Sequence, residues 1–263
     1  AAIVHATYYS SWPYRLRPGQ ALVSSHHDMT PERHPELFPL GQLRSPHGRK
    51  AEWFAASDLI LSNSAASADD LTFFWPQIQR PIRVIHLATG LDRVIPEPVP
   101  ALEGRRFWLL VGKRVPYKNV LTLLRALARL PHGSEAPILV CAGGGPFRAG
   151  ELRRFAQLPP PWRSALLQMS ANDRRLAWLY RHAEAVLVPS MAEGFSLPLI
   201  EALVCNTPVI ASDLEAHREV AGSFAQALVP ALNAAAWAEA LEPLLARPAP
   251  RPRTSLGESA YLD

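Results

Sequence analysis

Residues 189–201 read Pro-Ser-Met-Ala-Glu-Gly-Phe-Ser-Leu-Pro-Leu-Ile-Glu, and the rest of the chain is best understood outward from them. They follow an apolar run, residues 185–188, that is short and β-branched in the manner of a buried strand. Gly194 permits a tight turn, Ser196 is a helix-capping type, and Pro198 falls where the first turn of a helix tolerates proline. The segment therefore predicts a strand, a loop and the start of a helix.

The start of this helix is predicted to bind an anion. Its first N–H groups, on Phe195, Ser196 and Leu197, have no partners within a helix and point out of its mouth. Such a mouth carries about half an elementary positive charge, which suits a phosphate. Two carboxylates bracket it, with Glu193 in the loop and Glu201 inside the helix.

Glu201 is unusual because its neighbours in residues 199–204 are apolar, which predicts a largely buried helix. An ionised side chain in such a helix needs a partner or a ligand. Alternatively, Glu201 lies on the one solvated stripe of the helix. The local sequence leaves both interpretations open.

The overall composition is that of a globular protein. The chain has 263 residues, 48% of them hydrophobic, and no apolar run is long enough to span a bilayer. The net charge of +4 suits an anionic ligand or an anionic lipid surface, but it is too small to predict nucleic-acid binding. Cys141 and Cys205 lie in apolar contexts, which predicts buried thiols and a reducing cytoplasm.

Strand-like and helix-like segments alternate, which predicts βαβ units around parallel sheets. Predicted strands cover residues 3–5, 21–23, 59–61, 107–111, 137–142, 185–188 and 208–211, and predicted helices cover 64–74, 119–130, 173–182, 215–220 and 234–245. The alternation is weak over 1–95 and clear over 107–246, with a proline-rich linker at 96–106 and a tail at 247–263. The pattern thus divides the chain into two α/β domains.

A second group of functional candidates follows the first strand of the second domain. Gly112 permits close backbone approach, and Lys113, Arg114 and Lys118 stand within six residues of it. Both this loop and the loop with Glu193 leave the carboxyl ends of strands, so they should face the same crevice. Arginine and lysine together could neutralise a diphosphate, although the loop taken by itself favours the simpler interpretation of a solvated basic loop.

Three other features give weaker signals. His26, His27 and Asp28 suggest a metal, but adjacent side chains of a strand point to opposite faces and no further ligand completes a site. Residues 143–145 are three glycines without the spacing of a dinucleotide fingerprint. Trp178 and Tyr180 are predicted to be packing residues.

Taken together, these motifs resemble those of a known family. Residues 193–198 with Glu201, a Glu-x7-Glu motif, resemble the retaining family-four glycosyltransferases of the GT-B fold. Residues 111–119 resemble the Arg/Lys phosphate loop of that family, and residues 206–222 its following strand and helix. Residues 27–31 are similar to a loop of mannosyltransferase-like members. The resemblance implies an α/β GT-B fold of two Rossmann-like parallel-sheet domains, the first of which lacks its opening strands.

The resemblance also implies a reaction and a role for each site residue. The expected enzyme moves a sugar, mannose-like by preference, from a nucleotide diphosphate sugar such as GDP-mannose to an acceptor hydroxyl with retention. Glu201 should hold the ribose and Glu193 the transferred sugar. Arg114 and Lys118 should neutralise the diphosphate, with His27 reaching toward the sugar. Backbone groups at the site are expected at Gly112, Gly194, Phe195, Ser196 and Leu197.

Other expectations concern the setting of the reaction. The resemblance implies no cofactor and no metal, a glycan or lipid-linked glycan acceptor, and a part in cell-surface polysaccharide or lipopolysaccharide synthesis. The expected location is the cytoplasm, with peripheral contact at the inner face of the plasma membrane left open. The chain enters at Ala1 on a strand without methionine, so a non-catalytic nucleotide-sugar-binding remnant is the alternative. A phosphorylase of the same fold is disfavoured because no pyridoxal-phosphate lysine motif is present.

Overall fold

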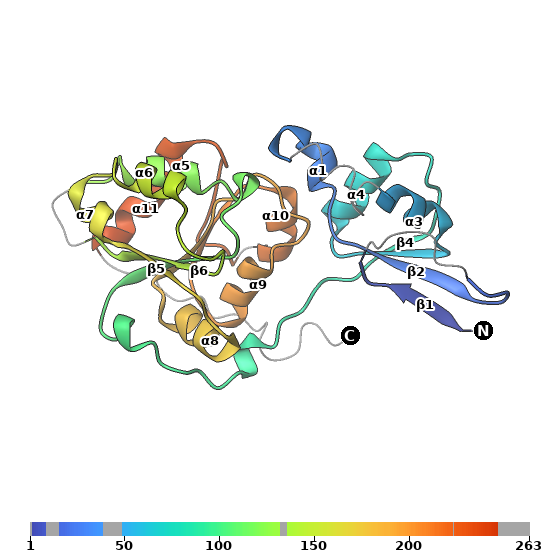
Figure 1. The fold of residues 1–263 in the computed structure, drawn as a ribbon, viewed down its shortest axis with the longest axis horizontal. Coiled ribbons are helices and arrows are strands. Elements are labelled where there is room, and N and C mark those ends of the chain that lie inside the picture. The colour runs from blue at the N-terminus through green and yellow to red at the C-terminus, as the bar shows by residue number, and fades with distance from the viewer. Residues whose placement is uncertain (1, 9–15, 39–48, 132–135, 223, 247–263) are drawn as a thin grey trace. The chain divides into compact units, whose positions relative to one another are not determined.

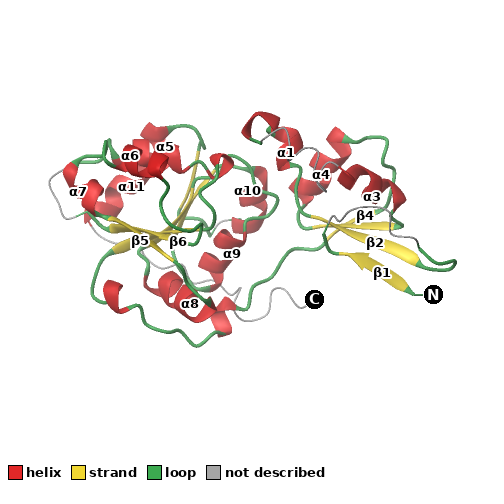
Figure 2. Cartoon of the chain, in the orientation of Figure 1, coloured by secondary structure: helices red, strands yellow, loops and turns green. Residues whose placement is uncertain are grey.

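A computed structural model describes residues 2–8, 16–38, 49–131, 136–222 and 224–246. It divides the chain into two compact units, one formed by Ala1–Leu87 with Glu193–Phe195 and the other by Ala88–Ala192 with Ser196–Asp263. Both units alternate strands with helices (Figure 2). The predicted tail, 247–263, lies outside the described residues.

The first unit is a parallel sheet of four strands in the order β1-β2-β3-β4. Its elements are β1 (Ile3–Ala6), β2 (Ala21–His26), α1 (Thr30–Arg33), η1 (Pro35–Leu37), α3 (Lys50–Ala56), β3 (Leu59–Ser62), α4 (Ala65–Phe74) and β4 (Ile82–Val84). Phe54 of α3, Leu71 of α4 and Ile60 of β3 are fully buried in one apolar cluster, which joins these helices to the sheet. The side chain of Ser64 accepts a hydrogen bond from the N–H of Ser67 and begins α4.

The second unit is a parallel sheet of six strands in the order β10-β9-β8-β5-β6-β7. Its strands are β5 (Phe107–Val111), β6 (Ile138–Ala142), β7 (Leu166–Met169), β8 (Ala185–Val188), β9 (Val209–Ser212) and β10 (Ala227–Val229). Its helices are η3 (Leu91–Arg93), η4 (Pro100–Leu102), η5 (Pro116–Lys118), α5 (Val120–Leu127), α6 (Ala149–Phe155), α7 (Pro160–Ser164), α8 (Asp173–His182), α9 (Leu197–Val204), α10 (Glu215–Ala221) and α11 (Ala234–Ala246). These two parallel sheets confirm the predicted α/β class.

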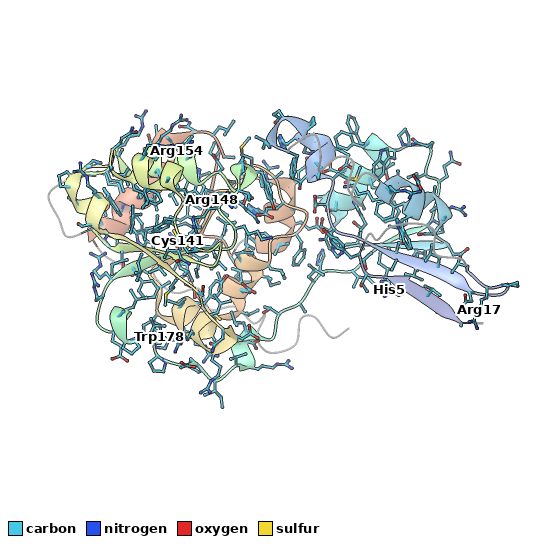
Figure 3. The ribbon with its side chains drawn as sticks, in the orientation of Figure 1. His5, Arg17, Cys141, Arg148, Arg154 and Trp178 are labelled. Atoms are coloured by element: carbon cyan, nitrogen blue, oxygen red, sulfur yellow. The ribbon has the colours of Figure 1, made fainter. Side chains whose placement is uncertain are left out.

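Helices cover both faces of the second sheet (Figure 1). The helices α5, α6, α7 and α11 lie on one face, and α8 lies on the other (Figure 1). Figure 3 shows the same layering, with Arg154 of α6 and Trp178 of α8 on opposite sides of Cys141 in β6. The main core lies on the first face, where Trp108 and Trp162 pack with ring centroids 5.4 Å apart. The run of buried residues in β5, β6, β8 and β9 follows from this two-sided cover.

The segment that precedes β5 is bound to α8. Arg181 Nη2 donates to the carbonyl oxygens of Asp92 and Val94, at 2.6 and 3.1 Å. The N–H of Glu97 donates to the carbonyl of Arg174 at 3.0 Å. The predicted linker, 96–106, therefore includes backbone that packs against this domain, and it contains the buried η4 residue Leu102.

The strand order of the second unit reverses between β5 and β8. The chain runs outward from β5 through β6 to β7, then returns to β8 on the other side of β5. In open α/β sheets, ligands bind at the carboxyl ends of the strands beside such a reversal. The loops that leave β5 and β8, 112–119 and 189–196, are the two that carry the predicted motifs.

Candidate functional site

The loops after β5 and β8 are joined to each other in the second unit. The N–H of Met191 donates to the carbonyl of Tyr117 at 2.7 Å. The Nδ2 of Asn119 donates to the carbonyls of Pro189, at 3.0 Å, and Ala231, at 2.7 Å. The two loops therefore meet at one edge of the second sheet, and a crevice shared with Glu193 stays a prediction.

The first loop leaves β5 through a glycine that its backbone requires. Gly112 has a φ of 109°, a region that residues with a side chain rarely adopt. Its N–H donates to the carbonyl of Ala142 at 2.9 Å, which continues the pairing of β5 with β6. The loop therefore begins close to the glycine run 143–145 that follows β6.

The helix α9 begins at Leu197, with Pro198 in its first turn as predicted. Ser196 occupies the N-cap position, but its side chain makes no capping hydrogen bond, so that part of the prediction is wrong. The reason is the backbone: Ser196 has φ 81° and ψ 81°, in the left-handed region, whereas capping serines are extended. Among the described residues the Ser196 hydroxyl has no hydrogen-bond partner, although the residue is 95% buried, with 5% of its surface exposed.

Glu201 lies in the second turn of α9 and is held by an adjacent helix. Tyr180 Oη of α8 donates to Glu201 Oε2 at 2.6 Å. Burial raises the pKa of Glu201, and the Tyr180 hydrogen bond opposes that rise. Burial, with the nearby Glu201 carboxylate, raises the pKa of Tyr180 well above its usual range. Of the two interpretations of Glu201, the structure supports a partly buried carboxylate with a partner.

The three cations of the first loop differ in their surroundings. Lys113 is exposed, and Lys118 Nζ lies 5.4 Å from the centre of the Tyr117 ring. The Arg114 side chain is 3% exposed and forms an ion pair with Glu151 of α6, with Nε 2.6 Å from Oε1. The roles of Arg114 and Lys118 toward a diphosphate stay predictions.

A cavity of about 470 Å³ opens beside this loop. It is lined by Lys113, Arg114, Val115, Gly144, Gly145, Arg148 and Glu151. Arg148 stands at the start of α6, where Figure 3 labels it. Arg148 and Glu151 belong to no recognisable motif, so their sequence context alone predicts no role for them. Their position could have indicated a role, since they follow the glycine run at the carboxyl end of β6.

The first unit contains His27 and the Glu193–Phe195 segment. His26 is fully buried with Nδ1 3.2 Å from Ser62 Oγ, whereas His27 Nε2 lies 2.8 Å from the carbonyl oxygen of Thr7. The two rings thus have different partners, from different parts of the first unit. Burial lowers the pKa of His26 to about 3. Within the described residues, no cluster of three or more His, Cys, Asp or Glu side chains is arranged to hold a metal.

Gly194 is tightly enclosed in the first unit. Its carbonyl accepts hydrogen bonds from Ser64 Oγ at 2.5 Å and Ser67 Oγ at 3.0 Å. A Cβ atom at this position would collide with the carbonyl oxygen of His27. Only glycine fits here, for steric reasons rather than for a left-handed backbone.

The sequence of the chain matches a known protein family. The sequence profile of the family described as "Glycosyl transferases group 1" matches residues 93–263. The chain is 31% identical over 280 residues to a D-inositol 3-phosphate glycosyltransferase of Xylanimonas cellulosilytica. This match covers 98% of the present chain and 67% of the relative. It is 29% identical to an MMP alpha-(1→4)-mannosyltransferase of Mycolicibacterium hassiacum, over 75% of this chain and 49% of the relative. The chain belongs to the group 1 glycosyl transferases.

Solved structures show the same fold at lower identity. The sucrose-phosphate synthase of Thermosynechococcus elongatus superposes with a TM-score of 0.66 at 24% identity, over 87% of this chain and 59% of that one. Anabaena HepE in complex with UDP and glucose gives a TM-score of 0.63 at 19% identity, over 85% and 62%. The chain thus spans between about half and two thirds of the length of these relatives. None of the described helices combines the length and the apolar character needed to cross a membrane.

Proposed function

We propose that the second unit binds a nucleotide diphosphate sugar at the carboxyl ends of β5 and β8. The observation that carries this proposal is the join between the two loops, through the Met191–Tyr117 and Asn119–Pro189 hydrogen bonds. These hydrogen bonds bring the cationic loop 112–119 close to the end of β8, the strand that leads into α9. Cations and a helix N-terminus are both suited to a diphosphate.

Each predicted group has a chemical task in this proposal. Glu201, oriented by Tyr180, accepts hydrogen bonds from the ribose hydroxyls. Lys118 and the exposed Lys113 offset the charge of the diphosphate. The N–H groups at the start of α9 complete its binding. Glu193 and His27 are proposed to contact the transferred sugar, and this part rests on the resemblance to family-four enzymes.

The proposed reaction is a transfer with retention of configuration. The bond between the anomeric carbon and the diphosphate oxygen breaks, and a bond from the acceptor oxygen to the same carbon forms on the same face. The acceptor proton passes to the departing phosphate oxygen, so no separate side-chain base is required. Cations and fixed N–H dipoles stabilise the charge that develops on the diphosphate. We propose that no metal ion is needed for this stabilisation.

The substrate proposals follow the relatives. A mannose-like donor such as GDP-mannose is favoured because one relative is named a mannosyltransferase. A sugar-phosphate or glycan acceptor is the corresponding proposal, since another relative is named an inositol-phosphate glycosyltransferase. We further propose a part in cell-surface glycan synthesis on the cytoplasmic side of the membrane.

Thermal denaturation with a panel of nucleotide sugars tests the donor proposal. UDP- and GDP-linked glucose, mannose and N-acetylglucosamine are each added to the chain, with and without EDTA. One donor should raise the melting temperature by the amount that mass action predicts for its dissociation constant, and EDTA should leave the rise intact. A panel without effect would contradict the proposal, and a rise abolished by EDTA would contradict its metal-free form. Turnover of the bound donor with an acceptor separates an enzyme from a binding remnant.

A further inference from the structure

We propose that Arg114 is a positioning residue, which holds the glycine loop 143–146 in the shape that lines the cavity, and does not itself contact the phosphates. The proposal concerns the same site and rests on the proposed function for its nucleotide part. It replaces the role in diphosphate neutralisation that the sequence predicts for Arg114.

The contacts of the guanidinium carry the first step. Arg114 Nη1 donates to the carbonyl of Gly143 at 2.9 Å, and Nη2 donates to those of Gly145 and Pro146 at 2.7 and 3.2 Å. Its Nε donates to Glu151 at 2.6 Å. An arginine has five N–H donors in a fixed planar fork, and these four contacts use four of them. A phosphate bound by two parallel N–H groups of Arg114 would have to displace at least one of these partners.

The glycine loop needs such an anchor. Gly143, Gly144 and Gly145 have φ values of 88°, 70° and 72°, so three consecutive residues are in the left-handed region. Glycine reaches this region without steric cost, but it also leaves the loop many other conformations. The three carbonyl contacts from Arg114 select one of them. The fit is close, because a Cβ at Gly144 would lie 2.8 Å from Arg114 Nη1 and 2.9 Å from the Gly112 oxygen.

Glu151 extends the same anchor into α6. One of its oxygens accepts from Arg114, and the other accepts from the N–H of Arg148 at 2.7 Å. The carboxylate therefore fixes both the guanidinium and the first turn of the helix. The positive charge of Arg114 is offset by Glu151, so the charge available to an anion in the cavity comes from Lys113 and Arg148.

The two roles predict opposite effects of Glu151→Gln. If Arg114 bound the phosphates directly, removing the competing carboxylate would release the cation and strengthen UDP or GDP binding. If Arg114 positions the loop, the same change loosens the guanidinium and weakens binding. We expect Glu151→Gln and Arg114→Lys each to weaken binding of UDP or GDP at least fivefold, measured by titration calorimetry.

Lys113→Ala is the matched control, because Lys113 lines the same cavity but is exposed. It should weaken nucleoside diphosphate binding and make the remaining affinity less sensitive to salt, as loss of a phosphate cation does. Arg114→Gln, which also removes a charge, should weaken binding with the salt sensitivity of the wild type retained. Stronger binding by Glu151→Gln, or a Lys113-like loss of salt sensitivity in Arg114→Gln, would overturn the proposal.

Hydrogen exchange of the ligand-free chain gives a readout that does not depend on the nucleotide. Amides in residues 143–149 should exchange at least fivefold faster in Arg114→Lys and Glu151→Gln than in the wild type or in Lys113→Ala. Unchanged exchange in both variants would show that Arg114 does not hold the loop. If the wild type binds neither UDP nor GDP, the proposed function fails, while this measurement still decides whether Arg114 is an anchor.

Discussion

Tyr180 Oη donates a 2.6 Å hydrogen bond to Glu201 Oε2 and thereby links α8 to α9, 21 positions apart in the chain. Tyr180 is fully buried, whereas Glu201 retains some exposure. A buried phenol that donates to a partly buried carboxylate leaves the other carboxylate oxygen available to a ligand. We therefore expect the Glu201 carboxylate to serve ligand binding, and the stability of the fold not to depend on it.

Glu201→Gln should separate binding from stability. The raised pKa of Glu201 means that the folded state disfavours its ionised form. Its contribution to stability is therefore present at acidic pH and is lost as the pH rises through the folded pKa. At pH 7 the neutral glutamine should leave the free energy of unfolding unchanged or higher. Binding of UDP or GDP should weaken by about 1.5–3 kcal/mol, the range for hydrogen bonds to charged groups.

Tyr180→Phe is the comparison variant for this prediction. It keeps the ring but removes the hydroxyl that opposes the rise in the Glu201 pKa, so that pKa should rise further. Nucleotide binding should then fail at a higher pH than in the wild type as the pH is lowered. Titration calorimetry across pH and urea denaturation measure the two quantities. A Glu201→Gln variant that is destabilised yet binds normally would make Glu201 structural.

Ser196→Gly should stabilise the chain. A residue with a side chain in the left-handed region costs about 1–3 kcal/mol, and the Ser196 hydroxyl gains no hydrogen bond within the described structure to offset it. Glycine removes that strain but adds about 0.5–1 kcal/mol of entropy to the unfolded chain, so the net gain should be about 1 kcal/mol. Urea denaturation gives the difference. Ser164→Gly, at the end of the helix α7, is the control and should destabilise. Equal losses from both changes would argue against strain at Ser196.

The sequence predicts some of these elements correctly and others not, and the difference has a physical cause. Apolar runs such as 107–111 and 185–188 predict strands because a strand buried on both faces needs them whatever else it contacts. Glycine at position 112 likewise reflects local geometry, its φ of 109°, whereas Gly194 is required by the carbonyl of His27, which is distant in the sequence. α7 was missed because its first residues, Pro160 and Pro161, indicate a turn, and a helix of one or two turns depends on its neighbours.

Pairings between distant residues were out of reach. Nothing in the sequence near Tyr180 indicates that its hydroxyl meets Glu201, and a packing residue was the natural prediction. Arg114 and Glu151 are 37 positions apart, and the local motif indicates a solvent-facing cation rather than an ion pair. The sequence predicts that Ser196 caps its helix because serine is a capping residue type. The sequence does not show the φ of Ser196, which prevents the capping hydrogen bond.

Stability should fall in acid because of His26. Its pKa is lowered to about 3, chiefly by burial and next by Lys50, with Asp28 acting in the opposite direction. The unfolded chain therefore binds more protons between about pH 3 and the ordinary value of 6.5, and stability rises with pH across that window. The loss should approach about 1.4 kcal/mol for each pH unit below 6.5.

Urea denaturation between pH 4 and 7 measures this effect. His26→Asn, which cannot titrate, should flatten the acid limb even if it is less stable at pH 7. Ser62→Ala is the control, because it removes the hydrogen-bond partner of His26 and should lower stability without changing the slope. Identical slopes in the wild type and His26→Asn would assign the acid sensitivity to other groups.

Asn119 supplies the side-chain part of the link between the two loops of the candidate site, beside the backbone hydrogen bond from Met191 to Tyr117. Its Nδ2 donates to the carbonyls of Pro189 and Ala231, and its Oδ1 accepts from Thr122 Oγ1 at 2.8 Å. Its φ of 54° also lies in the left-handed region, which asparagine tolerates better than alanine. Asn119→Ala should therefore cost about 1–3 kcal/mol for buried carbonyls without donors, and about 1–2 kcal/mol more for the backbone.

Asn119→Gly divides these two costs, because glycine accepts the left-handed backbone but restores none of the hydrogen bonds. It should be more stable than Asn119→Ala by about 1 kcal/mol in urea denaturation. Both variants should lose affinity for UDP or GDP by similar factors, since the join to Pro189 is broken in each. Affinity that recovered in Asn119→Gly would show that the backbone conformation, rather than the side-chain link between the loops, sets the geometry of the site.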